Sequence, residues 1–112
     1  MDVFFDFYNT ISDGCKSRSL TDKDLMMISK VINMKYTILV GKEFGFATSD
    51  LDRILYIHPR EVNYRLLYTW RNKNGRVANL KLCVQNLLSC WKRDHESVYL
   101  GELMSTIREI MK

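Results

Sequence analysis

The sequence predicts an all-α protein, a six-helix antiparallel bundle preceded by a short N-terminal extension. From residue 20 to residue 111, hydrophobic residues recur every three or four positions, which is the period of an amphipathic helix. No stretch alternates with the period of two that is typical of a half-buried strand. The 112 residues include one proline and five glycines, so hairpin turns are scarce. These observations favour helices joined by short polar loops.

The first predicted helix begins at Thr21 and runs to about residue 34. Thr21 and Asp24 have the spacing of a capping box, in which each side chain accepts a hydrogen bond from the backbone of the other residue. Its apolar stripe consists of Leu25, Ile28, Val31 and Ile32.

The second and third predicted helices cover about residues 36–44 and 48–58. A glycine inside a helix lowers its stability by about 1 kcal/mol relative to alanine. The close approach of a neighbouring helix is therefore the expected reason for Gly41, while Gly45 is placed to end the second helix. Asp50 and Asp52 are expected in the first turn of the third helix, where the helix dipole favours negative charge. Its buried side is predicted to be Leu51, Ile54 and Leu55.

Three further helices are predicted between Pro59 and the end of the chain. Pro59 ends the third helix and allows the fourth to start at once, and Gly75 closes the fourth. Asn79 can cap the fifth helix, and a sixth follows over about residues 100–110. The residues expected at the centre of the core are Leu66, Trp70, Leu80, Leu87 and Trp91.

The size of the chain is that of one domain, expected over residues 20–112, with residues 1–19 as an N-terminal extension or linker. Residues 4–11 have the pattern of a short amphipathic helix, and SDGCKSRS after them is typical of a flexible joint. The extension can be a linker whose aromatic side chains pack on the bundle, or a docking segment for a partner.

Composition indicates a soluble cytoplasmic protein. No segment approaches the roughly 18 to 20 uncharged apolar residues of a membrane span, and Asp2 and Asp6 stand where a secretory signal carries positive charge. An odd number of cysteines, at positions 15, 83 and 90, indicates reduced thiols rather than a disulfide framework.

The sequence contains no pattern that supports catalysis. Cys83, Cys90 and His95 do not have a usual zinc spacing, and Cys83 and Cys90 lie on a core-forming helix rather than in a polar cleft. Gly41 and Gly45 do not form a phosphate-binding loop. We therefore expect no enzyme activity, metal or cofactor, and we interpret His58 and His95 as surface residues.

Charge is distributed unevenly along the chain. Residues 60–93 contain eight basic residues and one acidic residue, a net +7 that leaves −3 for the remainder of a chain with a total of +4. Such a bipolar surface can dock one domain onto another, or it can simply keep a small protein soluble. The alternative function is a helical nucleic-acid-binding module that uses the basic 60–93 face. Asp50 and Asp52 disfavour it, because they crowd the helix expected to enter the groove.

Three segments carry the most specific pattern: LTDKDLMMISKVI, LVGKEFGFATSDLDRI and HPREVNYRLLYTWRNKNGRVANLKLCVQNL. Gly45 precedes the capped run SDLDRI, and Trp70 is followed by Gly75, Ala78 and Leu80. In this order and spacing, residues 20–110 resemble the death domain, the six-helix bundle of apoptotic and innate-immune signalling. The fourth and fifth helices are most similar to those of the Fas-associated adaptor, and adaptors of the insect immune-deficiency and Toll pathways are close alternatives. Thr37 and Gly41 depart from the family pattern, which often has Trp and a small Ala there.

The resemblance implies a signalling adaptor domain that assembles through three kinds of asymmetric contact. One pairs the second and third helices with the first and fourth, and another pairs the end of the fourth helix with the fifth-to-sixth joint. The third uses the third helix and adjoining loops. The implied partners are other death-domain proteins, whether receptor, adaptor or kinase, and homo-oligomers. The candidate partner-binding residues are Asp24, Lys42, Glu43, Asp50, Asp52, Arg53, Arg60, Arg65, Arg71, Lys73, Arg76, Asp94 and Glu96.

Overall fold

The computed structural model describes residues 2–112 and is all-helical over that range, so the predicted fold class is confirmed. All six predicted helices are present as α3 to α8, and two further α-helices precede them. Short 3-10 turns lie at Met34–Tyr36 and Gly75–Val77. The α-helices are α1 (Asp2–Asn9), α2 (Asp13–Lys16), α3 (Asp22–Ser29), α4 (Thr37–Glu43), α5 (Thr48–Ile57), α6 (Val62–Asn74), α7 (Leu80–Arg93) and α8 (Leu100–Ile110).

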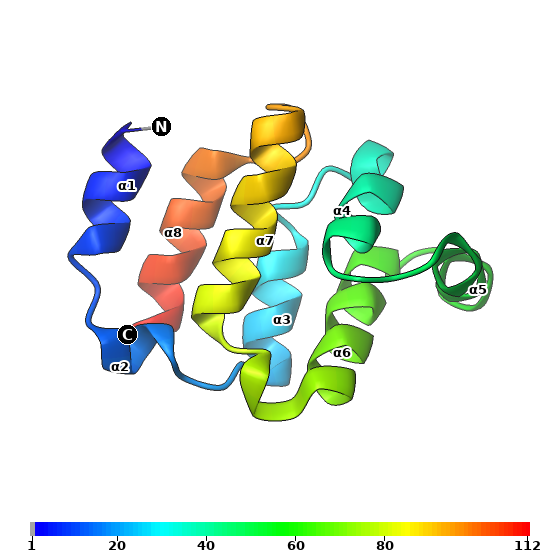
Figure 1. Cartoon of the computed structure of the whole chain (residues 1–112), viewed down its shortest axis with the longest axis horizontal. Helices are drawn as coiled ribbons and strands as arrows, with labels where there is room; N and C mark the ends of the chain where they lie inside the picture. Colours follow the sequence, from blue (N-terminus) through cyan, green and yellow to red (C-terminus); the bar gives the residue numbers. More distant parts are fainter. Residues whose placement is uncertain (1) are drawn as a thin grey trace.

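Five of the described helices pack side by side in a row, and α4 and α7 pack against them. Along the row, α1 packs against α8, α8 against α3, α3 against α6, and α6 against α5. Helices α4 and α7 pack against each other, and α4 also contacts α5 and α6. In Figure 1, α1 and α5 lie at opposite edges, and α5 is seen nearly end-on while α3, α6, α7 and α8 stand upright. Helix α5 therefore lies at one edge of the bundle, where it packs against α4 and α6.

The first predicted helix is shorter than expected, because α3 ends at Ser29 rather than near residue 34. Beyond it, the chain leaves the helix to pair with the segment before α8. The Asn33 N–H donates to the Ser97 carbonyl at 3.0 Å, and the Tyr99 N–H donates to the Val31 carbonyl at 2.9 Å. Val31 and Ile32 are nevertheless buried as predicted. Their positions in the core come from this backbone pairing rather than from a longer helix.

The predicted helix ends are largely confirmed. Thr21 and Asp24 form the capping box, and Asn79 caps α7 by accepting a hydrogen bond from the Leu82 N–H. Gly45 and Gly75 have φ of 91° and 59°, conformations that favour glycine. One boundary differs: α6 begins at Val62 and not directly after Pro59.

Gly41 lies at a close contact between α4 and α5. A Cβ atom at this position would overlap both methyl carbons of Leu51, which is itself buried in α5. The expectation of a close helix approach at Gly41 is confirmed. The predicted buried side of α5 is wrong in part, since Leu55 is 45% exposed and Ile54 is half-buried. Helix α5 contacts the bundle along a narrower stripe than its hydrophobic pattern suggests.

The N-terminal extension is folded onto the bundle. Phe4 and Ile11 are buried members of the hydrophobic core, as expected if the aromatic side chains pack on the bundle. The expectation of a flexible joint after them is wrong for four residues. Asp13–Lys16 form the one-turn helix α2, in which the Ser12 side chain accepts a hydrogen bond from the Cys15 N–H.

The core contains Leu66, Trp70, Leu80 and Leu87, as predicted. The prediction for Trp91 is wrong in part, because this side chain is only partly buried and its ring stacks on the exposed ring of His95 at a centroid distance of 4.0 Å. Burial raises the pKa of the Cys83 thiol to about 12. The Cys90 thiol also has a pKa raised to about 12, by burial and then by the nearby Glu43 carboxylate. No helix within residues 2–112 combines the length and apolar character needed to cross a bilayer.

Candidate functional site

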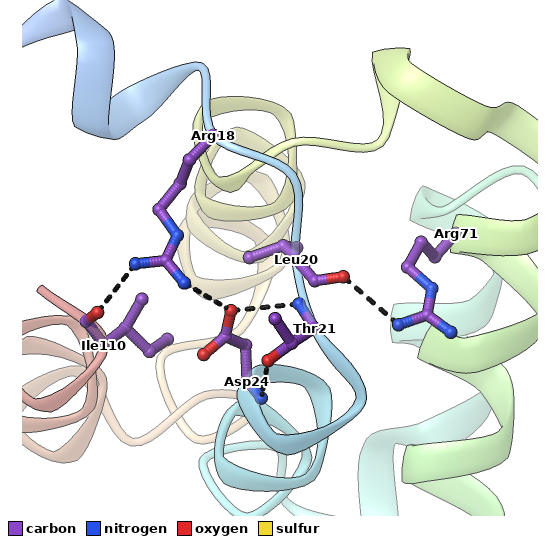
Figure 2. A network of polar contacts seen from close by, with 6 residues as sticks. All are labelled: Arg18, Leu20, Thr21, Asp24, Arg71 and Ile110. Carbon is purple, nitrogen blue, oxygen red and sulfur yellow. Dashed lines mark hydrogen bonds and ion pairs between the residues drawn. The ribbon is translucent and has the colours of Figure 1, made fainter.

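Two of the predicted partner-binding residues stabilise the domain itself. The Asp24 side chain is 8% exposed and accepts hydrogen bonds from Arg18 and from the Thr21 N–H, each at 3.0 Å. Arg18 also donates to the Ile110 carbonyl at 2.8 Å, so this guanidinium connects α3 with the last turn of α8. Figure 2 shows Arg18 between these two elements. Asp24 is therefore not available to a partner.

Arg71 has a similar role inside the domain, because it contacts the segment that leads into α3. Its guanidinium pairs with Asp22 at 2.6 Å and donates to the Leu20 carbonyl at 3.1 Å. The carbonyl contact is visible in Figure 2. The Arg71 side chain is only 19% exposed. Charge reversal at Arg71 would therefore act on folding, contrary to the sequence-based assignment of Arg71 to a docking surface.

Two other predicted residues form ion pairs within the domain. Glu43 pairs with Arg93 at 2.8 Å, which joins α4 to α7. Arg65 lies 3.5 Å from Glu61 through its Nε atom, but this atom is buried and forms no hydrogen bond. Leaving a buried donor without a partner costs about 1–3 kcal/mol. Arg65 is thus held near a carboxylate that does not satisfy its buried N–H.

The other predicted residues are partly or fully exposed. Asp50 accepts a hydrogen bond from the Ala47 N–H at 3.3 Å and so stabilises the start of α5. Asp94 accepts from the Glu96 N–H, and the Glu96 carboxylate accepts from the Tyr36 hydroxyl at 3.1 Å. The Tyr36 pKa is raised to about 12 by partial desolvation and by this acidic pair. The remaining candidates are exposed: Lys42, Asp52, Arg53, Arg60, Lys73 and Arg76.

The outer face of α5 carries exposed apolar side chains next to an acidic one. Tyr56 is 88% exposed and Leu55 is 45% exposed, and Asp52 lies one helical turn before them. We call Asp52, Leu55 and Tyr56 the α5 tip. Large apolar side chains gathered on the exposed face of one helix are typical of an interaction surface.

A groove of about 610 Å³ lies between the end of α3, the 3-10 turn at Met34 and the start of α6. Its apolar lining includes Met26, Met34, Tyr64 and Tyr99, and we call it the methionine groove. Flexible methionine side chains are common on surfaces that adapt to a partner. The charged residues of its lining are three cations and one anion: Lys30, Lys35, Arg60 and Glu61.

The floor of the methionine groove is fixed by a buried amide. Asn63 donates to the Ile32 carbonyl at 3.2 Å, and its side-chain oxygen accepts from the Thr37 hydroxyl at 2.8 Å. Asn63 and Thr37 are both buried. These bonds join α6 to the turn after α3, which both line the groove, and to α4 behind them.

A second groove, of about 370 Å³, lies between α5 and α6. Its apolar lining is Phe46, Ile54, Ile57 and Tyr68. Its charged lining residues are Asp50, Arg53, Arg65 and Lys73, and we call it the arginine groove. Among residues 2–112, no three His, Cys, Asp or Glu side chains gather as a potential metal site.

Sequence reasoning missed the apolar part of these surfaces. Met26, Met34 and Tyr99 fall outside the core-facing stripes, and Leu55 and Ile57 continue an apolar run that resembles a buried helix face. These side chains are exposed because α5 packs on the bundle at one edge and because α3 ends early. One signal in the sequence could have located these surfaces: a hydrophobic residue outside the core-facing stripe of its helix. Met26 and Tyr56 are such residues.

Comparison with known proteins finds no matching family model, no matching curated protein and no matching solved structure.

Proposed function

We propose that the chain is a cytoplasmic signalling adaptor domain of the death-domain class, which binds other death domains and further copies of itself. Two features support this proposal: the resemblance of residues 20–110 to that family, and the succession of six helices α3 to α8 over the same range. The proposed activity is protein assembly, without catalysis, metal or cofactor.

The observation that carries the proposal is that one domain presents two complementary surfaces. The α5 tip combines the Asp52 carboxylate with the exposed Leu55 and Tyr56 side chains. The methionine groove combines an apolar lining with a net positive charge. Opposite charges around apolar surfaces steer encounter and fix the orientation of the partners. We infer that the α5 tip of one domain contacts the methionine groove of the next.

This contact joins two different surfaces and is therefore heterologous. A heterologous contact leaves one surface free at each end of a growing assembly, so it produces rings or open chains rather than closed dimers. Such growth is consistent with an adaptor that recruits several receptor, adaptor or kinase domains.

A charge-exchange experiment tests the contact. Sedimentation velocity should show concentration-dependent association of the natural chain and its loss in the Asp52→Arg and Arg60→Asp variants. Each variant keeps one of the two surfaces intact. In a mixture, the natural α5 tip of the Arg60→Asp chain can therefore contact the natural methionine groove of the Asp52→Arg chain.

That mixture should regain association that neither variant shows alone. Lys81→Glu changes an exposed charge on α7 outside both surfaces and should leave association unchanged. Association that survives both single reversals would contradict the proposed contact. Binding to isolated death domains from receptors, adaptors and kinases, lost in Asp52→Arg, would test the class of partner.

Nucleic-acid binding remains the competing hypothesis for the basic face. Three of the eight cations in residues 60–93 already pair with carboxylates of the same chain: Arg65, Arg71 and Arg93. This internal pairing reduces the charge available for phosphates. A mobility shift of random duplex DNA that falls steeply with salt would favour the nucleic-acid hypothesis.

A further inference from the structure

We propose that the arginine groove binds an acidic peptide of another protein, in which a large apolar side chain stands beside aspartate or glutamate residues. This site is separate from the α5 tip and from the methionine groove, which serve the proposed assembly.

The shape of the groove suits a side chain rather than a flat protein surface. It is a hollow of about 370 Å³ between two helices, which lies within the usual size range of ligand pockets. Of its apolar lining, Phe46 is buried, Ile54 and Tyr68 are half-buried, and Ile57 is 58% exposed. An apolar side chain placed there would cover the exposed part of Ile57.

The charge around this hollow selects an acidic ligand. Arg53, Arg65 and Lys73 line it together with one carboxylate, that of Asp50. Asp50 already accepts a hydrogen bond from the Ala47 N–H, which directs its charge toward the start of α5. Arg53 and Lys73 are exposed and belong to none of the ion pairs found in residues 2–112. Because Arg65 already pairs with Glu61, Arg53 and Lys73 against Asp50 leave the lining an excess of one positive charge next to an apolar surface.

Arg65 is held in a defined position in the same lining. Its buried Nε atom has no hydrogen-bond partner, although a Glu61 oxygen lies 3.5 Å away. The guanidinium rests against the rings of Tyr64 and Tyr68, at 5.6 and 5.7 Å from their centroids. Stacking on two rings limits the rotation of this side chain. A ligand carboxylate within reach would find an Arg65 side chain already oriented.

A peptide explains these features better than a phosphate backbone does. Phosphates would gain nothing from the apolar lining, whereas an acidic peptide supplies carboxylates and an apolar side chain together. Recognition by an apolar anchor with flanking charges is a common mode of peptide binding.

The test is a fluorescence anisotropy titration with a labelled probe peptide of sequence EEDLFDEE. Binding by the natural chain is expected to weaken at least tenfold in Lys73→Glu and in Arg53→Glu, and several-fold in Ile57→Ser. All three side chains are exposed, so circular dichroism melting should confirm that the variants remain folded. Lys81→Glu has the same change of charge outside the groove and should bind like the natural chain.

Two control peptides separate a built site from general attraction of charge. The peptide EEDAADEE keeps the acidic residues and lacks the apolar anchor, and QQNLFNQQ keeps the anchor and lacks the charge. Both should bind at least tenfold more weakly than the probe. Equal binding of EEDAADEE, an equal loss in Lys81→Glu, or no measurable binding of the probe would each overturn the proposal.

The assembly and peptide proposals can fail separately. Asp52→Arg should lose self-association yet retain the probe, while Lys73→Glu should lose the probe yet retain self-association. If Lys73→Glu also prevents assembly while the probe does not bind, the arginine groove contacts a second copy of the chain and the peptide proposal is wrong.

Discussion

Arg18 and Asp24 form a hydrogen-bonded ion pair at 3.0 Å that joins the N-terminal extension to the first helix of the bundle. The same carboxylate caps α3, and the same guanidinium donates to the end of α8. The extension is thus attached by a polar contact as well as by the buried side chains of Phe4 and Ile11.

Removal of the Arg18 side chain should destabilise the domain. Arg18→Ala leaves the buried Asp24 carboxylate without its cation and the Ile110 carbonyl without its donor. Because Arg18 is itself about one-third exposed, water compensates in part, and we expect a loss of about 1–3 kcal/mol. Urea unfolding measures it, and the exposed Lys23→Ala should change stability by less than about 0.5 kcal/mol. Equal effects of the two variants would contradict the role of Arg18.

The two cations at the end of α6 should respond differently to charge reversal. Arg71→Glu places a carboxylate beside Asp22 and the Leu20 carbonyl, so its melting temperature should fall by several degrees. Lys73→Glu changes an exposed side chain two positions further on and should melt like the natural chain. An unchanged melting temperature in Arg71→Glu would contradict this role and make Arg71 a candidate partner-binding residue again.

Glycines at two helical positions should give opposite results when replaced by alanine. Gly41→Ala inserts a methyl group into the space filled by Leu51 and should destabilise by about 1–3 kcal/mol. Gly101→Ala faces open space in α8 and should stabilise by up to about 1 kcal/mol, through helix propensity. Denaturant midpoints of the two variants provide the comparison, and an unchanged or raised midpoint for Gly41→Ala would be evidence against the Gly41–Leu51 contact.

The N-terminal helix should contribute to stability through one face. Phe4 is 3% exposed, whereas the neighbouring Val3 is 70% exposed. Phe4→Ala should lower the free energy of unfolding by about 2–4 kcal/mol, a modest value for a Phe→Ala change because Phe4 lies at the edge of the core. Val3→Ala should be close to neutral. Unchanged stability of Phe4→Ala in urea unfolding would mean that α1 is not part of the cooperative unit.

Thiol chemistry should follow burial and pH. At pH 8 only Cys15, which is half-buried, should react quickly with a thiol reagent, because Cys83 and Cys90 are buried and their pKa values are raised to about 12. In the unfolded chain these thiols ionise near pH 9. Their contribution to stability is therefore complete below that value and decreases as pH rises toward 12. Rapid labelling of all three thiols in the folded protein would contradict this arrangement.

Local signals in the sequence were enough to locate the bundle helices. The spacing of apolar residues identified α3 to α8, and Thr21, Gly45 and Asn79 marked helix ends through backbone chemistry that acts within a few residues. The early end of α3 could not be predicted this way, because the bonds that cause it come from residues 97–99, more than sixty positions away.

The candidate site was less predictable for the same physical reason. Arg71 and Lys73 carry the same charge and lie two positions apart on the same helix. Only the three-dimensional position of Asp22 shows that Arg71 forms an ion pair within the domain. Asp24 was identified correctly as a capping residue, yet its burial depends on Arg18 and on the end of α8. The exposure of a charged residue is set by tertiary contacts, which a linear pattern does not contain.

The buried bonds of Asn63 have a kinetic consequence for the methionine groove. Since Thr37 and the Ile32 carbonyl hold its floor before any partner arrives, the groove need not rearrange to receive one. Association should then follow a single exponential, with a rate constant near the ordinary protein–protein range of about 10⁵–10⁷ M⁻¹s⁻¹. Lower ionic strength should raise that rate constant, because Lys30, Lys35 and Arg60 attract the α5 tip over a longer range. Most of the variation in affinity among partners would lie in how long each complex lasts.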